Sequence, residues 1–314
     1  MKYEKYGLVN TTAMFGDALS GHYAIGAFNF YNMETFAAIL GAARETKSPI
    51  ILAVSESAIK YMSDDILMSM IDAAHISQNE NVALHLDHGH SFDACAHAID
   101  IGFSSVMIDA SDLPFEENIA LSAKVAQYAH AHGVSTEAEL GVLKGQEDEN
   151  TFSDTELYTN PSDVPDFVSR SGVDSLAVAI GTSHGAYKMK SDKQQLRFDI
   201  LAEIMAKTPD FPLVLHGASS IPSHLVQRIN DNGGNIQNAH GIPVHQLQQA
   251  ATTNVCKINV DSDSRLAFTA AIRQNLAVAP QNFNPREYLA MAMSAVYENT
   301  IDEITNIMNS ANRI

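Results

Sequence analysis

Short apolar runs alternate with longer amphipathic stretches along almost the whole chain. The stretches between the runs, such as METFAAILGAARET and EENIALSAKVAQYAHAHG, carry apolar residues at helical spacing. Gly102, Gly133 and Gly172 stand where helical stretches end, a position that favours a residue free to adopt positive φ. Eight runs have the length and composition of buried strands, at residues 23–30, 49–57, 82–89, 105–111, 134–141, 175–183, 212–219 and 255–263.

Eight alternations of strand and helix predict parallel pairing, because each return to a parallel strand needs a crossover helix. Eight is also the number of strands that closes a parallel barrel of about 250 residues. The predicted fold is therefore α/β, a (β/α)8 TIM barrel with a C-terminal helical extension at about 285–311. No repeat, low-complexity tract or linker divides the chain, so we expect a single domain over 1–314. Two long polar loops, 142–161 and 231–243, are candidates for functional segments.

The composition is that of a soluble globular protein, with 46% hydrophobic and 18% charged residues. No run approaches about 18 uninterrupted apolar residues, and the N-terminal MKYEKYGLVN lacks the apolar core of a signal peptide. Cys95 and Cys256 form no disulfide framework, which favours a reducing, cytoplasmic setting. The net charge of −18 argues against nucleic-acid binding, and an anionic ligand would need positive potential supplied locally.

Polar and ionisable residues gather at the carboxyl ends of the predicted strands, where the active site of such a barrel forms. An inert barrel has no reason to collect ionisable groups at one face, where charge repulsion and desolvation both cost free energy. From the second strand to the eighth, these groups lie at residues 55–57, 87–90, 109–111, 137–139, 182–185, 216–219 and 259–263.

His88, His184 and His216 end strands three, six and seven and could converge on one ion. Three imidazoles with an open position are typical of a catalytic divalent-metal site, with zinc the leading candidate. One such histidine alone is more often a hydrogen-bonded packing residue, but here the strand-end placement repeats three times. His85 lies inside strand three and is expected to be buried and structural, and His90 to neighbour a helix cap.

Carboxylates accompany these histidines. Asp87 could be a general acid/base whose pKa is set by the metal and by burial, or it could orient a histidine. Asp109 and Glu139 could form a second cation site or orient the first. Glu147 lies in the acidic loop, from which a carboxylate could deliver a proton when the loop closes.

Two turns could hold a phosphate. HGASS (216–220) and NVDS (259–262) each run from a strand into a helix, and their small residues expose backbone N–H groups. Barrels of this type commonly bind phosphate after strands seven and eight. Amides and hydroxyls would hold the anion, so the net charge of −18 is no objection.

Taken in this order, the motifs resemble the class II, metal-dependent fructose-1,6-bisphosphate aldolases, and the class IIB branch with shorter loops looks closest. The resemblance runs over roughly 20–290. It implies a (β/α)8 fold, zinc dependence, a sugar bisphosphate as substrate and a homodimer or homotetramer, with neither nucleic acid nor membrane as a partner. The motifs that carry it include HLDHGHSFDA, STEAELGVLKGQED, AIGTSHGAYK, LVLHGASSIP, KINVDSDSR and NPREYL.

The resemblance also implies residue roles. His88, His184 and His216 would hold the catalytic zinc. Asp87 would act at the C4 hydroxyl, Glu147 would transfer a proton at C3, and Asp109 and Glu139 match positions that hold a second divalent metal. A monovalent cation, Na⁺ or K⁺, is expected near the phosphate turns. The residues expected to bind substrate are Ser55, Gly185, Gly217, Ala218, Ser219, Asn259, Asp261, Ser262, Arg265 and Arg286, the last reaching into a neighbouring subunit.

The implied reaction is the reversible cleavage of D-fructose 1,6-bisphosphate to dihydroxyacetone phosphate and D-glyceraldehyde 3-phosphate, in glycolysis and gluconeogenesis. Zinc would polarise the carbonyl and stabilise the enediolate while Asp87 takes the C4 hydroxyl proton. The nearest alternative is a tagatose-1,6-bisphosphate aldolase. Those relatives carry NVATELK where this chain has NVDSDSR, so Asp261 and Arg265 favour fructose. The chain departs from the family at Lys144, where glycine is usual, which predicts a stiffer loop.

Three further alternatives remain open from the sequence. A Schiff-base aldolase could use Lys257, whose strand parity matches that of Asn259 and Asp261. A metal-dependent hydrolase is suggested by His88-Gly-His90, but it gives no reason for two phosphate turns. A non-catalytic barrel that serves as a binding scaffold would keep its function when Asp87 is replaced by alanine.

Overall fold

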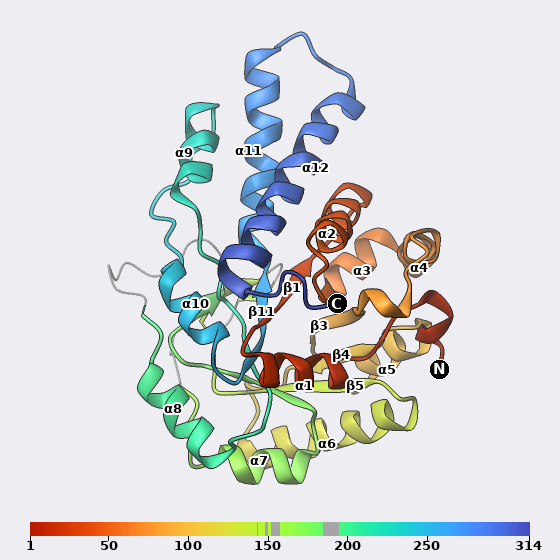
Figure 1. Ribbon diagram of the computed structural model, residues 1–314, viewed down its shortest axis with the longest axis vertical. Coiled ribbons are helices and arrows are strands. Elements are labelled where there is room, and N and C mark those ends of the chain that lie inside the picture. Colours follow the sequence, from red (N-terminus) through yellow and green to blue (C-terminus); the bar gives the residue numbers. More distant parts are fainter. Residues whose placement is uncertain (143, 148–149, 152–157, 185–194) are drawn as a thin grey trace.

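Eight parallel strands close into a barrel in the computed structural model of this protein (Figure 1). The structure describes residues 1–142, 144–147, 150–151, 158–184 and 195–314. The strands are β1 (Ile25–Asn29), β2 (Ile50–Ser55), β3 (Val82–Gly89), β4 (Ser105–Ile108), β5 (Ser135–Leu140), β8 (Ser175–Val178), β10 (Leu213–Leu215) and β11 (Val255–Val260). Around the barrel their order is β1-β11-β10-β8-β5-β4-β3-β2. Each lies inside one of the eight predicted apolar runs, which confirms the predicted (β/α)8 barrel.

Helices surround the barrel (Figure 1). They are α1 (Thr11–Gly21), α2 (Met33–Thr46), α3 (Glu56–Met62), α4 (Asp64–Ala73), α5 (Phe92–Ile101), α6 (Phe115–Ala131), α7 (Val164–Ser171), α8 (Phe198–Lys207), α9 (Ser223–Asp231), α10 (Val244–Ala251), α11 (Ser262–Val278) and α12 (Pro285–Asp302). Short 3₁₀ segments η1 (Tyr3–Tyr6) and η2 (Gln78–Glu80) join them, and α12 continues into the π-helical η3 (Glu303–Met308). The predicted C-terminal extension is therefore α12 with η3. None of the described helices combines the length and the apolar character that a membrane-spanning helix requires.

Outside the barrel, β6 (Lys144–Glu147), β7 (Asn150–Thr151) and β9 (Ser183–His184) form a small sheet in the order β7-β6-β9. β6 lies in the long polar loop predicted at 142–161, and β9 follows barrel strand β8. Lys144 pairs with Ser183, and Gly145 with His184. The acidic loop is thereby joined to the segment that carries the predicted histidine of strand six.

Local sequence signals explain where the helices begin and end. The side chains of Asn10 and Asn32 accept hydrogen bonds from the first free N–H groups of α1 and α2, as N-cap residues do. Gly102, Gly133 and Gly172 adopt φ values of 124°, 72° and 67° at or just beyond the ends of α5, α6 and α7. The expectation of positive φ at these three glycines is therefore confirmed.

The strands divide their side chains between two environments, as β3 illustrates. Leu84 and Leu86 belong to the apolar cluster between the strands and the outer helices, whereas Ala83 belongs to a separate cluster inside the barrel. Side chains alternate along a strand, so His85 and Asp87 face the barrel interior with Ala83. His85 is fully buried, as expected.

Helix α1 closes the amino-terminal end of the barrel. Its Met14 and Phe15 pack against interior residues at the beginnings of the strands, among them Ile25 and Cys256. The buried ionisable side chains of the strands, in contrast, lie from the middle of the strands to their carboxyl ends. The ionisable groups that could form a site therefore lie towards the carboxyl end.

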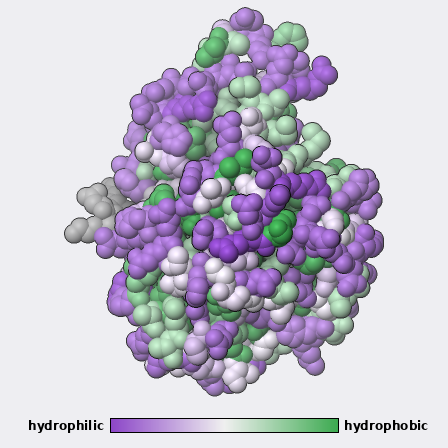
Figure 2. Space-filling view, in the orientation of Figure 1, coloured by the Kyte–Doolittle hydropathy of each residue, from purple (hydrophilic) through white to green (hydrophobic). Residues whose placement is uncertain are grey.

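The α11–α12 hairpin projects from the barrel (Figure 1). Figure 2 shows mainly hydrophilic residues on the visible face, with hydrophobic residues in small groups, some of them at the tip of this hairpin. Phe283, in the connection between the two helices, is 91% exposed, and Val278 at the end of α11 is 77% exposed. The tip therefore presents apolar side chains to the surroundings of the single chain.

We expect Phe15→Ala to lower the free energy of unfolding by about 3–5 kcal/mol, because it opens a cavity in the packed end of the barrel. Phe283→Ala removes the same atoms from an exposed position, so it should change stability by less than about 0.5 kcal/mol. Urea denaturation of both variants tests the comparison, and equal losses would contradict the assigned role of α1.

Candidate active site

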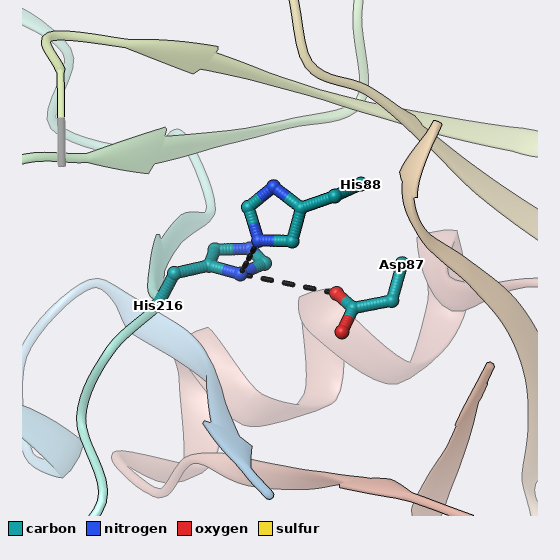
Figure 3. A group of neighbouring side chains, drawn as sticks. All are labelled: Asp87, His88 and His216. Carbon is teal, nitrogen blue, oxygen red and sulfur yellow. Dashed lines mark hydrogen bonds and ion pairs between the residues drawn. The ribbon is translucent and has the colours of Figure 1, made fainter. Parts of the chain in front are cut away.

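Asp87, His88 and His216 lie together inside the carboxyl end of the barrel (Figure 3). Asp87 and His88 come from β3, and His216 directly follows β10. His216 Nδ1 lies 2.9 Å from His88 Nε2 and 3.8 Å from Asp87 Oδ1. All three residues are buried, so they form an enclosed polar centre.

Asp87 and His88 are sequence neighbours whose side chains both face this centre (Figure 3), which breaks the normal alternation of a strand. The backbone shows how: His88 has φ of 48°, and the pairing of β3 with β4 shifts register between Leu86 and Gly89. A left-handed conformation is unfavourable for a residue with a Cβ and recurs at functional sites. The irregularity allows one strand to supply two adjacent functional groups.

Carboxylates fix the tautomers of the two histidines. Asp109 Oδ2 lies 2.8 Å from His88 Nδ1, and Glu137 Oε1 lies 2.7 Å from His216 Nε2. Because ionised carboxylates only accept hydrogen bonds, each of these ring nitrogens carries the proton. In the neutral rings, His88 Nε2 and His216 Nδ1 then hold lone pairs that point at each other across 2.9 Å. Burial, followed by the nearby Lys257 and His88, lowers the pKa of His216 and favours its neutral form.

This donor set fits a divalent metal. Two neutral imidazoles, each oriented by a carboxylate on its other nitrogen, reproduce the usual surroundings of metal-binding histidines. Their facing lone pairs would repel each other without a shared cation or proton, and a metal ion satisfies both. Asp87 adds an anionic oxygen to the same group.

Asp87 is held as an anion. Burial by itself would raise the pKa of Asp87, but His88, His216, Lys257 and His85 together outweigh it and hold the pKa well below its usual range. Asn29 Nδ2 donates to Oδ2 at 2.8 Å, and Asn259 Nδ2 donates to Oδ1 at 2.9 Å. The carboxylate is therefore ionised and fixed in orientation, as a general base must be.

The sequence analysis missed Asn29 and gave Glu137 no role. Asn29 is the polar residue at the carboxyl end of the first strand. The polar strand ends named above start with the second strand. Extending the same criterion to the first strand identifies Asn29. Glu137 lies two residues before Glu139 on β5 and faces the same interior. Its role depends on which side chains it meets across the barrel, which its sequence position does not give.

Asp109 and Glu139 lie near Nδ1 of His88, whereas His216 lies near its Nε2. Asp109 accepts hydrogen bonds from the N–H and hydroxyl of Ser111 at 3.1 and 2.7 Å, besides its contact with His88. Burial would raise the pKa of Asp109, but its hydrogen bonds with His88 and Ser111 hold it below its usual range. Glu139 Oε2 lies 4.0 Å from His88 Nδ1. Asp109 thus orients His88, and the three residues also form a second group that could hold a cation.

The two turns predicted to hold phosphate border the same end of the barrel. Gly217 has φ of 58°, and a Cβ atom there would lie 2.6 Å from the backbone of Ser183, so only glycine fits. Ala218 and Ser219 follow it and are buried. Asp261 precedes α11, and Ser262 is the first residue of that helix. The order of strands β10 and β11 places the two turns side by side.

Comparisons with known proteins agree with this geometry. A family described as Fructose-bisphosphate aldolase class-II matches residues 9–313. The chain belongs to the class II fructose-bisphosphate aldolase family. The fructose-bisphosphate aldolase of Treponema pallidum (strain Nichols) is 46% identical over 99% of each chain. That of Giardia intestinalis is 46% identical over 93% of this chain and 90% of that protein. The crystal structure of the YdjI aldolase from Escherichia coli K12 matches with a TM-score of 0.77 and 30% identity, over 98% of this chain and 99% of that one.

Membership of the class II aldolase family confirms the resemblance and identifies the chain as a lyase. The hydrolase and the non-catalytic scaffold are thereby set aside. The names of these relatives favour fructose bisphosphate over the tagatose alternative. Class II aldolases are metal-dependent, and the cluster of Asp87, His88 and His216 provides donors for such an ion.

Ser55, Arg265 and Arg286 were predicted to bind substrate, and they lie in three different surroundings. Ser55 ends β2 in register with Asp87 and caps α3. Arg265 Nε donates to Asp261 Oδ1 at 2.8 Å, and its guanidinium lies 5.2 Å from the centre of the Tyr31 ring. Arg286 is exposed in the first turn of α12, at the outer end of the projecting hairpin (Figure 1).

Three predicted residues lie wholly or partly outside the described part of the chain. His184 ends β9 and Glu147 ends β6, and only their backbones are described. Gly185 lies outside the described residues. Their predicted contacts remain predictions.

Lys257 occupies the interior directly beneath His216 and has no exposed surface. Its Nζ donates to both oxygens of Glu137, at 3.0 and 2.8 Å, and to His85 Nε2 at 3.2 Å. Burial would raise the pKa of Glu137, but Lys257, His216 and His85 hold it below its usual range. Burial and then Lys257 lower the pKa of His85 to about 3, so that ring is neutral. Lys257 is therefore the charge partner of Glu137, and membership of the metal-dependent class II family argues against the Schiff-base alternative.

We expect Lys257→Met to lower the free energy of unfolding by about 3–5 kcal/mol, because it leaves the buried Glu137 carboxylate without its cation. The double variant Lys257→Met/Glu137→Gln should recover most of that loss, since both members of the pair are then neutral. Lys60→Met, at an exposed position on α3, serves as the control. Urea denaturation of the metal-free proteins gives these values, and a single variant as stable as wild type would refute the ion pair's role.

Proposed function

We propose that this centre cleaves D-fructose 1,6-bisphosphate reversibly, with a zinc ion held by His88, His216 and His184. The opposed ring nitrogens of His88 and His216, 2.9 Å apart and each backed by a carboxylate, are the observation that carries the proposal. The backbone position of His184 at the end of β9 is compatible with a third ligand. Three histidines leave a coordination position for substrate, as catalytic zinc sites do.

A bound zinc ion would polarise the substrate ketone and stabilise the negative charge that develops as the C3–C4 bond breaks. Asp87 removes the C4 hydroxyl proton, because it is ionised and held by the amides of Asn29 and Asn259. C4 becomes the aldehyde carbon of glyceraldehyde 3-phosphate, and the electron pair of the broken bond stays with the C3 fragment. Glu147, entering as the carboxylic acid, donates a proton to C3 and so yields dihydroxyacetone phosphate, and exchange with solvent then removes the proton from Asp87 and restores that of Glu147.

The phosphate of the dihydroxyacetone half is held by the turn Gly217, Ala218 and Ser219 and by the amino end of α11, with Asp261 and Ser262. Backbone N–H groups and the helix dipole favour an anion there. Gly185 completes this side, a monovalent cation (Na⁺ or K⁺) lies near the turns, and Ser55 contacts the glyceraldehyde phosphate half. Asp109 and Glu139 can hold a second divalent metal beside His88, a role supported by their closeness to it.

The working form is a homodimer or homotetramer, in which Arg286 of a neighbouring subunit reaches the distal phosphate. The exposure of Arg286 on a projecting hairpin supports this assignment. The enzyme acts in the cytoplasm, in glycolysis and gluconeogenesis. Its two cysteines, both buried free thiols, suit a reducing compartment.

We expect rapid cleavage of fructose 1,6-bisphosphate, loss of that activity in EDTA and recovery when zinc is added. Tagatose 1,6-bisphosphate, assayed in parallel, should be cleaved at least about tenfold more slowly in kcat/KM, because a C4 epimer misplaces the hydroxyl relative to Asp87. A coupled assay for both triose phosphates measures each case. Activity that withstands EDTA would refute the metal site, and preference for the tagatose ester would overturn the substrate alone.

We expect Asp87→Asn to lower kcat for fructose 1,6-bisphosphate on the order of 10³-fold, within the usual contribution of a general base. The amide retains the size of the carboxylate, so the circular dichroism spectrum and bound zinc should be close to those of wild type. Asp17→Asn, at an exposed position on α1, is the matched control and should retain full activity. A drop of less than about tenfold in the Asp87 variant would remove Asp87 from the role of base.

A further inference from the structure

Two buried carboxyl groups meet behind the turn assigned to the substrate phosphate, and neither contacts the polar centre. Asp263 lies in the first turn of α11 and is fully buried, and Glu303 begins η3 and is 3% exposed. The carboxyl group of Glu303 lies within hydrogen-bonding reach of that of Asp263. Within the described parts of the chain, no lysine, arginine or histidine forms an ion pair with either group. With no cationic side chain of the described residues beside them, the two groups avoid a buried double negative charge only if one of them keeps its proton.

Asp263 fastens the backbone that follows the phosphate turn. Its Oδ2 accepts hydrogen bonds from the Ser220 N–H at 2.7 Å and the Ser220 hydroxyl at 3.0 Å. Its Oδ1 accepts from the Ile221 N–H at 2.8 Å. Ile221 has φ of 50°, a left-handed conformation that is strained for a β-branched residue and persists only where its surroundings enforce it. The bonds to Asp263 supply that restraint directly after Ser219.

The opposite side of the turn is packed too tightly to adjust. Ser219 O accepts a hydrogen bond from the Ile242 N–H at 3.1 Å. A Cβ atom on Gly241 would lie 2.1 Å from the backbone of Ser220. Residues 219–221 are thus held between Gly241–Ile242 on one side and Asp263 on the other, so the turn keeps its position only while both sides hold it.

Glu303 in turn fixes Asp263. Two carboxylates in contact inside the protein cannot both be ionised at low cost. Burial, with the charge of Asp263, raises the pKa of Glu303 well above its usual range. Glu303 is then the neutral partner, and its O–H donates to Asp263. An ionised carboxylate has about four acceptor sites, so three donors from the turn and one from Glu303 satisfy it.

We propose that Glu303 is a positioning residue for the substrate phosphate, which acts by donating a hydrogen bond to Asp263 and thereby holding the turn through Ser220 and Ile221. The proposal rests on the proposed phosphate site at Gly217–Ser219. Through Glu303, the C-terminal π-helix η3 thereby affects substrate binding without touching the substrate. The expected signature is a change in binding of the phosphate group with little change in the chemical step.

The central test compares Glu303→Leu with Glu303→Gln. The leucine variant removes the donor, and KM for fructose 1,6-bisphosphate and Ki for inorganic phosphate should each rise about tenfold, the usual range for one lost buried hydrogen bond. Its kcat should stay within about twofold of wild type. Glutamine keeps a donor without ionising, so Glu303→Gln should restore both constants to within about twofold. Glu298→Gln, an exposed carboxylate on α12, is the matched control.

Hydrogen exchange gives a second readout that does not depend on activity. In the substrate-free protein, the amides of Ser220 and Ile221 should exchange about tenfold faster in Glu303→Leu than in wild type or Glu303→Gln. If the leucine variant does not fold, Glu303→Asp takes its place, because it withdraws the acid by one methylene and should show the same changes. Wild-type KM and exchange in the variants that lose the donor would overturn the proposal. A glutamine variant as impaired as the leucine variant would overturn it as well.

The variant Ser219→Ala distinguishes a failure of the role proposed for Glu303 from a failure of the proposed phosphate site. A raised Ki for inorganic phosphate in that variant supports the proposed phosphate turn. A Ki equal to that of wild type would show that phosphate binds elsewhere, and the role proposed for Glu303 would fall with the turn. An increase in Ki for Ser219→Ala, with none for Glu303→Leu, would overturn the role of Glu303 alone.

Discussion

The ammonium group of Lys257 lies inside the barrel without exposed surface, in contact with both oxygens of Glu137. Burying either charge alone would cost several kcal/mol, so each requires the other. The pairing leaves Glu137 ionised, and an ionised Glu137 can only accept the proton of His216 Nε2. The lone pair of His216 is therefore directed at His88. The metal-binding character of the centre depends on this ion pair, which lies one layer below it.

Carboxylates take different roles here because their surroundings differ. Asp109 and Glu137 each accept a proton from a histidine and so act on the imidazoles. Asp87 accepts hydrogen bonds from two amide groups, and its pKa stays well below its usual range. Glu303 is buried beside Asp263, and burial together with the charge of Asp263 raises its pKa well above its usual range. The side chain is chemically the same in each case, and the charges packed against it decide whether it orients, accepts or donates.

The centre also depends on local backbone strain. His88 and Ile221 both adopt left-handed conformations, one beside the proposed metal and one beside the proposed phosphate turn. His88 is held by Asp109 and by its position in β3, and Ile221 by Asp263. In both cases a hydrogen bond to a carboxylate stabilises the strained segment. The same physical arrangement thus supports the two halves of the site.

The sequence by itself determined the barrel, because eight apolar runs separated by amphipathic stretches can bury their strands only with helices outside. It also determined the end at which the polar groups lie, since parallel strands bring their carboxyl ends to one face. The roles of Asn29, Glu137 and Lys257 were decided by tertiary structure alone. Lys257 was open to interpretation as a nucleophile until its contact with Glu137, 120 positions away in the chain, was known. Which buried charges neutralise one another depends on distances across the barrel, and closure of the barrel sets those distances.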